Sequence, residues 1–202
     1  MISLRRVLAA VAAIGAVAAA TAAPAGATVT TFDFHRISNT NSVLTIYRQE
    51  LLDGRILNQA SYRAGSGLNR NECDSAAYDN VGGWLPAGYY NLWGHFHHYA
   101  GSLIQGRVWR LQDKRCNGGT GTLRTDLFIH SEETYTNQQA CQSPYVERFC
   151  WDNDGDYYSL GCIKVSRNSS NPPADLGRLN TNWDDWSGLH GYFNLSQRLY
   201  VY

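Results

Sequence analysis

The chain lacks several features that mark common protein classes. It has no excess of charge of either sign, with 17 Lys+Arg against 17 Asp+Glu in 202 residues. A chain without a basic surplus has no field to attract nucleic acid or anionic lipid. It also has no sustained 3.6-residue hydrophobic pattern after residue 27 and no CxxC pair. Because aromatic residues make up 12%, disorder, coiled coil and collagen are excluded, and one globular domain remains.

The only long hydrophobic run lies at the start of the chain. Arg5 and Arg6 precede an apolar stretch from Val7 to Ala23, and Ala25-Gly26-Ala27 follows. This order is typical of a secretory signal peptide. A membrane anchor is the alternative, but spanning needs about 20 strongly apolar residues and this stretch is mostly alanine. We therefore expect a secreted protein that is associated with no membrane after cleavage.

The remaining chain divides simply. Removing residues 1–27 leaves a net charge near −2 and no expected nucleic-acid partner. Residues 28–41 are interpreted as a short N-terminal arm, and residues 42–202 as a single domain. No internal repeat or linker divides that domain.

Five cysteines remain after the leader, and in an exported protein cysteines tend to pair. An odd number leaves one over, and four cysteines allow three pairings. The pairing adopted here joins Cys73 to Cys116 and Cys141 to Cys150, which makes Cys162 the free thiol. The cysteines have no zinc-site spacing, and the run His95-Phe96-His97-His98 lacks a supporting carboxylate, so no metal is expected.

Short alternating apolar runs between Gly, Asn, Ser and Asp clusters predict a mainly β fold, a sandwich or barrel with short helices at most. Asp53-Gly54 is a hairpin signal between two of these runs. Asn171 to Gly188 is expected to be irregular or weakly helical. The expected strands cover Val43 to Tyr47, Arg55 to Arg63, Tyr89 to Tyr99, Leu103 to Leu111, Leu127 to Ile129, Ile163 to Val165 and Leu199 to Tyr202.

Two of these runs carry reactive groups. Leu127-Phe128-Ile129 ends at His130, and Ser159-Leu160-Gly161-Cys162 leads into the run from Ile163. Cysteine catalysis needs a thiolate, and a neighbouring imidazole favours ionisation and later protonates the leaving amine. Gly161 permits a tight turn whose main-chain N–H groups can serve as an oxyanion hole. A buried core cysteine and histidine are the alternative, but the unpaired thiol and the turn favour catalysis.

At these residues the sequence resembles the L,D-transpeptidase catalytic domain of bacterial cell-wall enzymes. That family carries an apolar strand ending in His, and then Ser/Thr-His-Gly-Cys before another apolar strand. The resemblance extends upstream to Leu85-Pro86-Ala87-Gly88-Tyr89, which is similar to the family's Thr-Pro-x-Gly-x-Tyr turn, and to the hairpin around Asp53-Gly54. It covers about Val43 to Val165.

The resemblance implies a reaction and a set of roles. Cys162 would be the nucleophile and His130 its base, the Ser131 carbonyl would orient the imidazole, and the N–H groups of Gly161 and Cys162 would bind the oxyanion. The substrate would be a peptidoglycan stem peptide, with a thioester resolved by an amine into a cross-link and no cofactor needed. A secreted, cell-wall-associated monomer is expected. The expected substrate contacts are Ser159, Lys164, Arg124 and Trp151.

Two departures from the family pattern keep alternatives open. Leu160 stands where the family has His, and His130 and Cys162 are 32 positions apart, a longer gap than is usual there. A disulfide-stapled insertion that contains Cys141 and Cys150 would account for the extra length. The alternatives are a peptidoglycan L,D-carboxypeptidase or hydrolase on the same fold, and a cell-wall-binding domain that has lost catalysis.

Overall fold

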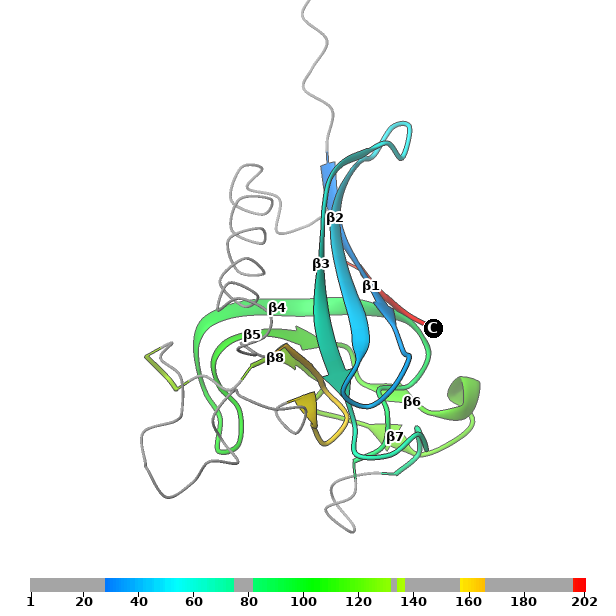
Figure 1. Cartoon of the computed structure of the whole chain (residues 1–202), viewed down its shortest axis with the longest axis vertical. Helices are drawn as coiled ribbons and strands as arrows, with labels where there is room; N and C mark the ends of the chain where they lie inside the picture. Colours follow the sequence, from blue (N-terminus) through cyan, green and yellow to red (C-terminus); the bar gives the residue numbers. More distant parts are fainter. Residues whose placement is uncertain (1–27, 75–81, 132–133, 137–156, 166–197) are drawn as a thin grey trace, which may run out of the picture.

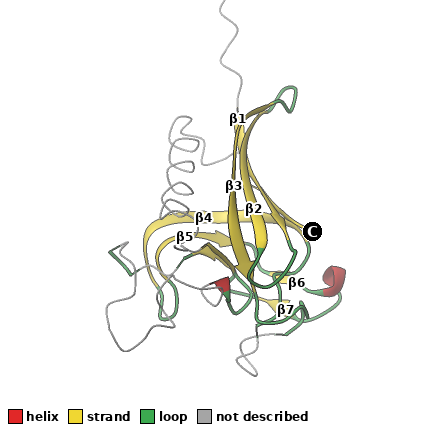
Figure 2. Ribbon diagram, in the orientation of Figure 1, coloured by secondary structure: helices red, strands yellow, loops and turns green. Residues whose placement is uncertain are grey.

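The computed structural model describes residues 28–74, 82–131, 134–136, 157–165 and 198–202. Within them, eight strands form a closed barrel in the order β1-β10-β4-β5-β8-β9-β3-β2, which confirms the mainly β prediction. Figures 1 and 2 show β1, β2 and β3 as long neighbouring strands that cross the direction of β4 and β5. No helix in the described ranges has the length and hydrophobicity of a membrane span.

The first three strands form an antiparallel meander. They are β1 (Thr28–His35), β2 (Ser42–Glu50) and β3 (Ile56–Ser66). The hairpin predicted at Asp53-Gly54 lies between β2 and β3, where the Gly54 N–H donates to the Glu50 carbonyl at 2.9 Å.

The expectation of an N-terminal arm over residues 28–41 is wrong for its first part. Residues 28–35 are β1, a barrel strand that pairs with β2 on one side and β10 on the other. Phe32 and Phe34 are fully buried while their neighbours are partly exposed. This period of two is the signature of a strand with one face in the core. In the sequence the pattern is incomplete, because the buried positions 28 and 30 are threonines and the partly exposed position 29 is valine.

The second half of the barrel brings distant segments together. β4 (Gly88–Ala100) pairs with β5 (Gln105–Leu111), and β5 pairs with β8 (Phe128–His130). β8 runs parallel to β9 (Ile163–Val165), which pairs with β3, and β10 (Arg198–Val201) runs parallel to β1. These parallel pairs close the barrel, and one of them carries the predicted reactive residues.

The barrel interior is a single apolar core. Burying it supplies the main stabilising free energy of the fold, because apolar surface contributes about 25 cal/mol per Å² removed from water. The core residues come from all eight strands and from two connecting segments: Phe32, Phe34, Leu44, Ile46, Tyr62, Ala64, Leu85, Tyr90, Trp109, Leu111, Leu127, Ile129, Ile163, Val165, Leu199 and Val201.

A small hairpin lies outside the barrel. β6 (Lys114–Arg115) pairs with β7 (Leu123–Arg124), and a single 3₁₀ turn, η1 (Asn117–Gly119), lies between them. Cys116, at the end of β6, is bonded to Cys73, which confirms that part of the expected pairing. Cys141, Cys150 and the segment from 171 to 188 lie outside the described residues.

Candidate active site

The predicted reactive residues lie on two adjacent strands. β8 and β9 run parallel, with Ile129 opposite Ile163 and His130 opposite Lys164. The side chains of Ile129 and Ile163 point into the barrel core. Because successive side chains on a strand alternate between faces, His130, Lys164 and the residue before β9, Cys162, share the opposite face.

On that face Cys162 and His130 are diagonal neighbours. Strand spacing and rise place their Cα atoms about 8 Å apart. The hydrogen bonds that the structure gives these two groups run to other partners, from Sγ to the Asp126 carbonyl and from Nδ1 to the Ser131 carbonyl. The topology therefore places two residues that are 32 positions apart in the chain on one face of adjacent strands. The parallel pairing of β8 and β9 is the reason.

His130 is held in one tautomer. Its Nδ1 lies 3.1 Å from the Ser131 carbonyl oxygen. Because a carbonyl can only accept, Nδ1 carries the proton, and Nε2 holds the lone pair in the neutral ring. Burial, together with the positive charge of Lys164, lowers the pKa of His130 to about 4. The imidazole is therefore neutral at physiological pH, and its Nε2 can act as a base.

Cys162 is unbridged and buried, 6% exposed. Its Sγ donates to the Asp126 carbonyl at 3.6 Å. Burial raises the pKa of the thiol to about 11, and a main-chain hydrogen bond from Phe128 and the charge of Arg124 act in the opposite direction. The resting thiol is therefore protonated at neutral pH, on the same sheet face as a neutral imidazole.

The turn before Cys162 is closed by Ser159. The Ser159 hydroxyl donates to the Cys162 carbonyl at 2.6 Å and accepts from the N–H groups of Gly67 at 3.0 Å and Gly161 at 3.2 Å. These three bonds use the full capacity of a hydroxyl, so Ser159 holds the turn instead of contacting a substrate as expected. The Gly161 N–H already donates to the Ser159 hydroxyl, so it would have to break this hydrogen bond in order to bind an oxyanion.

Two expected substrate contacts are buried. Arg124 is 3% exposed, and its guanidinium donates to three main-chain carbonyls, which corrects the expectation that it faces a ligand. Lys164 is 6% exposed and lies beside His130, where its charge disfavours the imidazolium. Trp151, the other expected contact, lies outside the described residues.

Some residues of the site were not predicted from the sequence. Asp126 has a positive φ of 54°, and its carbonyl faces the thiol. Its position directly before the run at Leu127 was the available signal, because Asp tolerates this conformation at turns. A second apolar cluster joins Phe128 and Val108 to Cys162, with Tyr99 and Ile104 packed against it.

The thiol and the imidazole are both nearly covered by protein, at 6% and 8% exposed. A surface depression does occur in the described part of the chain, but it is lined by Tyr89, Tyr90, Lys114 and Arg115 and by none of the predicted site residues. In the ranges covered by the structure, no three His, Cys, Asp or Glu side chains are grouped as metal ligands. His95 instead stacks on Trp109, with ring centroids 4.7 Å apart.

Comparison with known proteins does not extend the resemblance beyond these motifs. No model of a known protein family matches the chain, and no curated protein matches it either.

Proposed function

We propose that this protein is a secreted cysteine acyltransferase of the L,D-transpeptidase type, which acts on peptidoglycan stem peptides. The observation that carries the proposal is the parallel pairing of β8 with β9, which aligns an unbridged thiol and a buried neutral imidazole on one face of adjacent strands. The hydrogen bond from His130 to the Ser131 carbonyl supports it, because it leaves Nε2 as the basic nitrogen.

The proposed reaction proceeds in two acyl transfers. His130 Nε2 takes the proton from Cys162 as Sγ attacks the carbonyl of the third stem residue. The C–N bond to the terminal D-alanine then breaks, its amine leaves with the proton from the imidazolium, and a thioester remains on Sγ. An amine from a second stem attacks that thioester and passes its proton back through His130 to the sulfur. No cofactor takes part.

With these pKa values, the proposed reaction requires proton transfer in step with attack. A thiol with a pKa of about 11 and an imidazole with a pKa of about 4 do not form an ion pair at rest. The imidazolium is disfavoured by burial and by Lys164, so it exists only while the proton moves from the thiol to the leaving amine. This arrangement is closer to the general-base activation of a serine than to a preformed thiolate.

The location outside the cytoplasm is part of the same proposal. The leader motif in residues 1–27 and the Cys73–Cys116 disulfide support export, since disulfides persist in oxidising compartments. Peptidoglycan stem peptides are the proposed partners of the monomer.

A second candidate is a cell-wall-binding domain that has lost catalysis. Two observations favour it. Leu160 occupies the position of the family's second histidine, and with a pKa of about 11 only about one thiol in ten thousand is ionised at pH 7.

Acylation by a carbapenem tests the leading proposal. The intact wild-type protein is expected to gain the mass of one carbapenem, and Cys162→Ala to gain none. His130→Gln is expected to react at least about 100-fold more slowly, the usual contribution of a general base. The matched control is His35→Gln, which removes an exposed imidazole from β1 and is expected to react as the wild type does.

The products separate the remaining alternatives. Incubation with tetrapeptide stems yields cross-linked dimers from a transpeptidase and tripeptides alone from a carboxypeptidase. One result would overturn the proposed enzyme activity and support the binding domain. In that result the folded wild-type protein resists acylation, and wild type and Cys162→Ala are retained equally on purified peptidoglycan.

A further inference from the structure

Arg124 is a buried cation close to the thiol. It belongs to β7 and is 3% exposed. Its guanidinium donates to the carbonyls of Glu72 at 2.6 Å, Leu160 at 3.0 Å and Trp84 at 3.5 Å. Carbonyl acceptors solvate a guanidinium without neutralising it, so these hydrogen bonds leave the positive charge intact.

The same side chain is packed against the turn that presents Cys162. Leu160, one of its acceptors, is two residues before the thiol. Gly161 lies so close to the guanidinium that a Cβ at this position would overlap it, and its φ of +115° is one that L side chains rarely adopt. The guanidinium charge also lowers the pKa of Cys162. Arg124 therefore acts on the turn both by contact and by charge.

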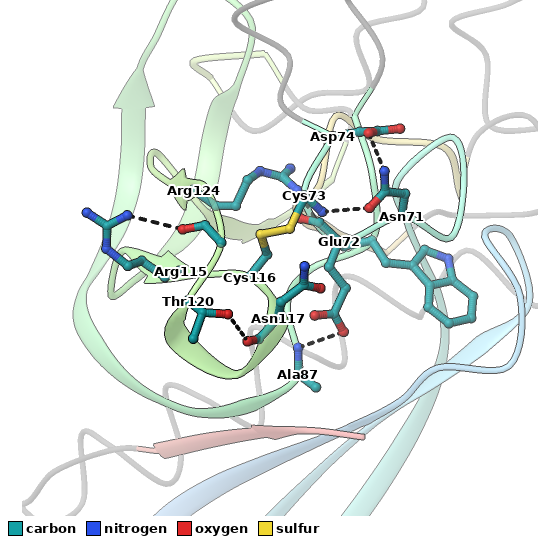
Figure 3. The surroundings of a disulfide bond; sticks show 12 residues. Asn71, Glu72, Cys73, Asp74, Ala87, Arg115, Cys116, Asn117, Thr120 and Arg124 are labelled. Atoms are coloured by element: carbon teal, nitrogen blue, oxygen red, sulfur yellow. Dashed lines mark hydrogen bonds between the residues drawn. A yellow bond between two sulfur atoms is a disulfide. The ribbon is translucent and has the colours of Figure 1, made fainter.

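The Cys73–Cys116 disulfide fixes the position of Arg124 from two sides. Cys116 directly follows β6, which is paired with β7 so that Lys114 lies opposite Arg124. Cys73 directly follows Glu72, whose carbonyl accepts the 2.6 Å bond from Arg124. Figure 3 shows the Arg124 side chain beside the disulfide, with Glu72 next to it.

The Glu72 side chain anchors this segment further. Its carboxylate pairs with Arg36 and accepts the Ala87 N–H at 3.1 Å. The Cys73 N–H donates to Asn71 Oδ1 at 3.1 Å. The Glu72 carbonyl is thus held by several contacts and is a fixed support for the guanidinium.

We infer that Arg124 is a positioning residue that holds the turn from Ser159 to Cys162 and stabilises the Cys162 thiolate, and that the Cys73–Cys116 disulfide keeps it in place. The inference rests on the proposed role of Cys162 as nucleophile. Its measurable consequence, the reactivity of one thiol, does not depend on which acceptor resolves the thioester.

The test measures thiolate formation directly. The rate of modification of Cys162 by methyl methanethiosulfonate is followed from pH 7 to 10.5 in full-length variants, with the modified peptide quantified by mass spectrometry. Because only the thiolate reacts, Arg124→Gln is expected to lower the rate about tenfold at pH 8. The matched control, Arg55→Gln, removes an exposed arginine between β2 and β3 and is expected to keep the wild-type rate.

Arg124→Lys separates charge from positioning. Lysine keeps the charge but lacks the planar fork that reaches several carbonyls at once. Its rate with methyl methanethiosulfonate is expected to lie within about threefold of wild type, whereas its acylation by a carbapenem is expected to fall at least about tenfold. Equal losses in both reactions would contradict the positioning role.

Removal of the disulfide keeps the inference testable if Arg124→Gln does not fold. Cys73→Ala/Cys116→Ala is expected to slow Cys162 modification in the same direction as Arg124→Gln. A folded Arg124→Gln that reacts at the wild-type rate would overturn the role of the charge, and a folded disulfide variant with the wild-type rate would overturn the support by the disulfide. Failure of the proposed function gives a different result, because in that case carbapenems do not acylate the wild-type protein.

Discussion

Acid is expected to destabilise the folded protein through one buried histidine, His130. Burial and the charge of Lys164 lower the pKa of His130 from its usual 6.5 to about 4. Between these two values the unfolded chain binds a proton that the folded protein excludes. The stability contributed by the neutral ring is therefore complete above pH 6.5 and is lost as the pH falls through this range.

The gap between the two pKa values sets the magnitude. Each pKa unit corresponds to 1.36 kcal/mol, so the free energy of unfolding is expected to fall by about 3 kcal/mol between pH 7 and pH 4 because of this group. For a domain whose total stability is about 5–15 kcal/mol, this is a large fraction. Carboxylates that are protonated in the same pH range also change the free energy of unfolding. A comparison with a variant that lacks His130 separates their contribution from that of the histidine.

Urea denaturation of wild type and His130→Gln at pH 4, 5, 6 and 7, followed by tryptophan fluorescence, isolates the effect. The variant is expected to lose about 3 kcal/mol less than the wild type over this range. Lys164→Met is expected to reduce the acid loss as well, because it removes a charge that lowers the pKa of His130. His35→Gln, which removes an exposed imidazole, is the control and is expected to show the full wild-type loss. An equal acid loss in wild type and His130→Gln would refute the reasoning.

The disulfide, one buried tyrosine and the thiol each allow a simpler test. Replacing Cys73 and Cys116 by alanine opens a loop of 43 residues and is expected to lower the free energy of unfolding by about 4 kcal/mol in urea titrations; a change below about 1 kcal/mol would contradict this. Tyr90→Phe removes a buried 2.6 Å hydrogen bond to the Pro86 carbonyl and is expected to cost about 1 kcal/mol by thermal unfolding, whereas an unchanged Tm would contradict a contribution from that bond. Modification of Cys162 is expected to accelerate about tenfold per pH unit from pH 7 to 10, because its pKa is about 11, and a plateau below pH 9 would contradict the burial argument.

Local patterns predicted much of the barrel correctly. The hairpin at Asp53-Gly54 has both a turn signal and alternating apolar residues on either side, and both are properties of neighbouring residues. The strands ending at His130 and starting after Cys162 were also readable, because each is a short apolar run beside a Gly or a polar residue. β1 is not evident from the sequence, since two of its buried positions are threonines and the outward Val29 breaks the alternation.

The roles of single polar residues were harder to predict. Ser159 and Arg124 were expected to meet a substrate because of their positions near Cys162 and His130. In the fold their partners are the Gly67 N–H and the Glu72 carbonyl, which are 92 and 52 positions away in the chain. No local sequence pattern encodes such distant partners. The sequence alone therefore does not distinguish a polar residue that holds the main chain near a site from one that binds the substrate.

The sequence by itself determined most of the barrel strands, the odd number of cysteines after the leader, and which histidine and cysteine stand at strand ends. These are properties of local alternation, turn chemistry and counting. The tertiary structure decided that β8 lies parallel to β9, that Lys164 lies beside His130, and that Arg124 donates to the Leu160 carbonyl in the turn before the thiol. Barrel closure between distant segments sets these neighbours, and they determine the burial and the charges that in turn set the pKa values of the thiol and the imidazole.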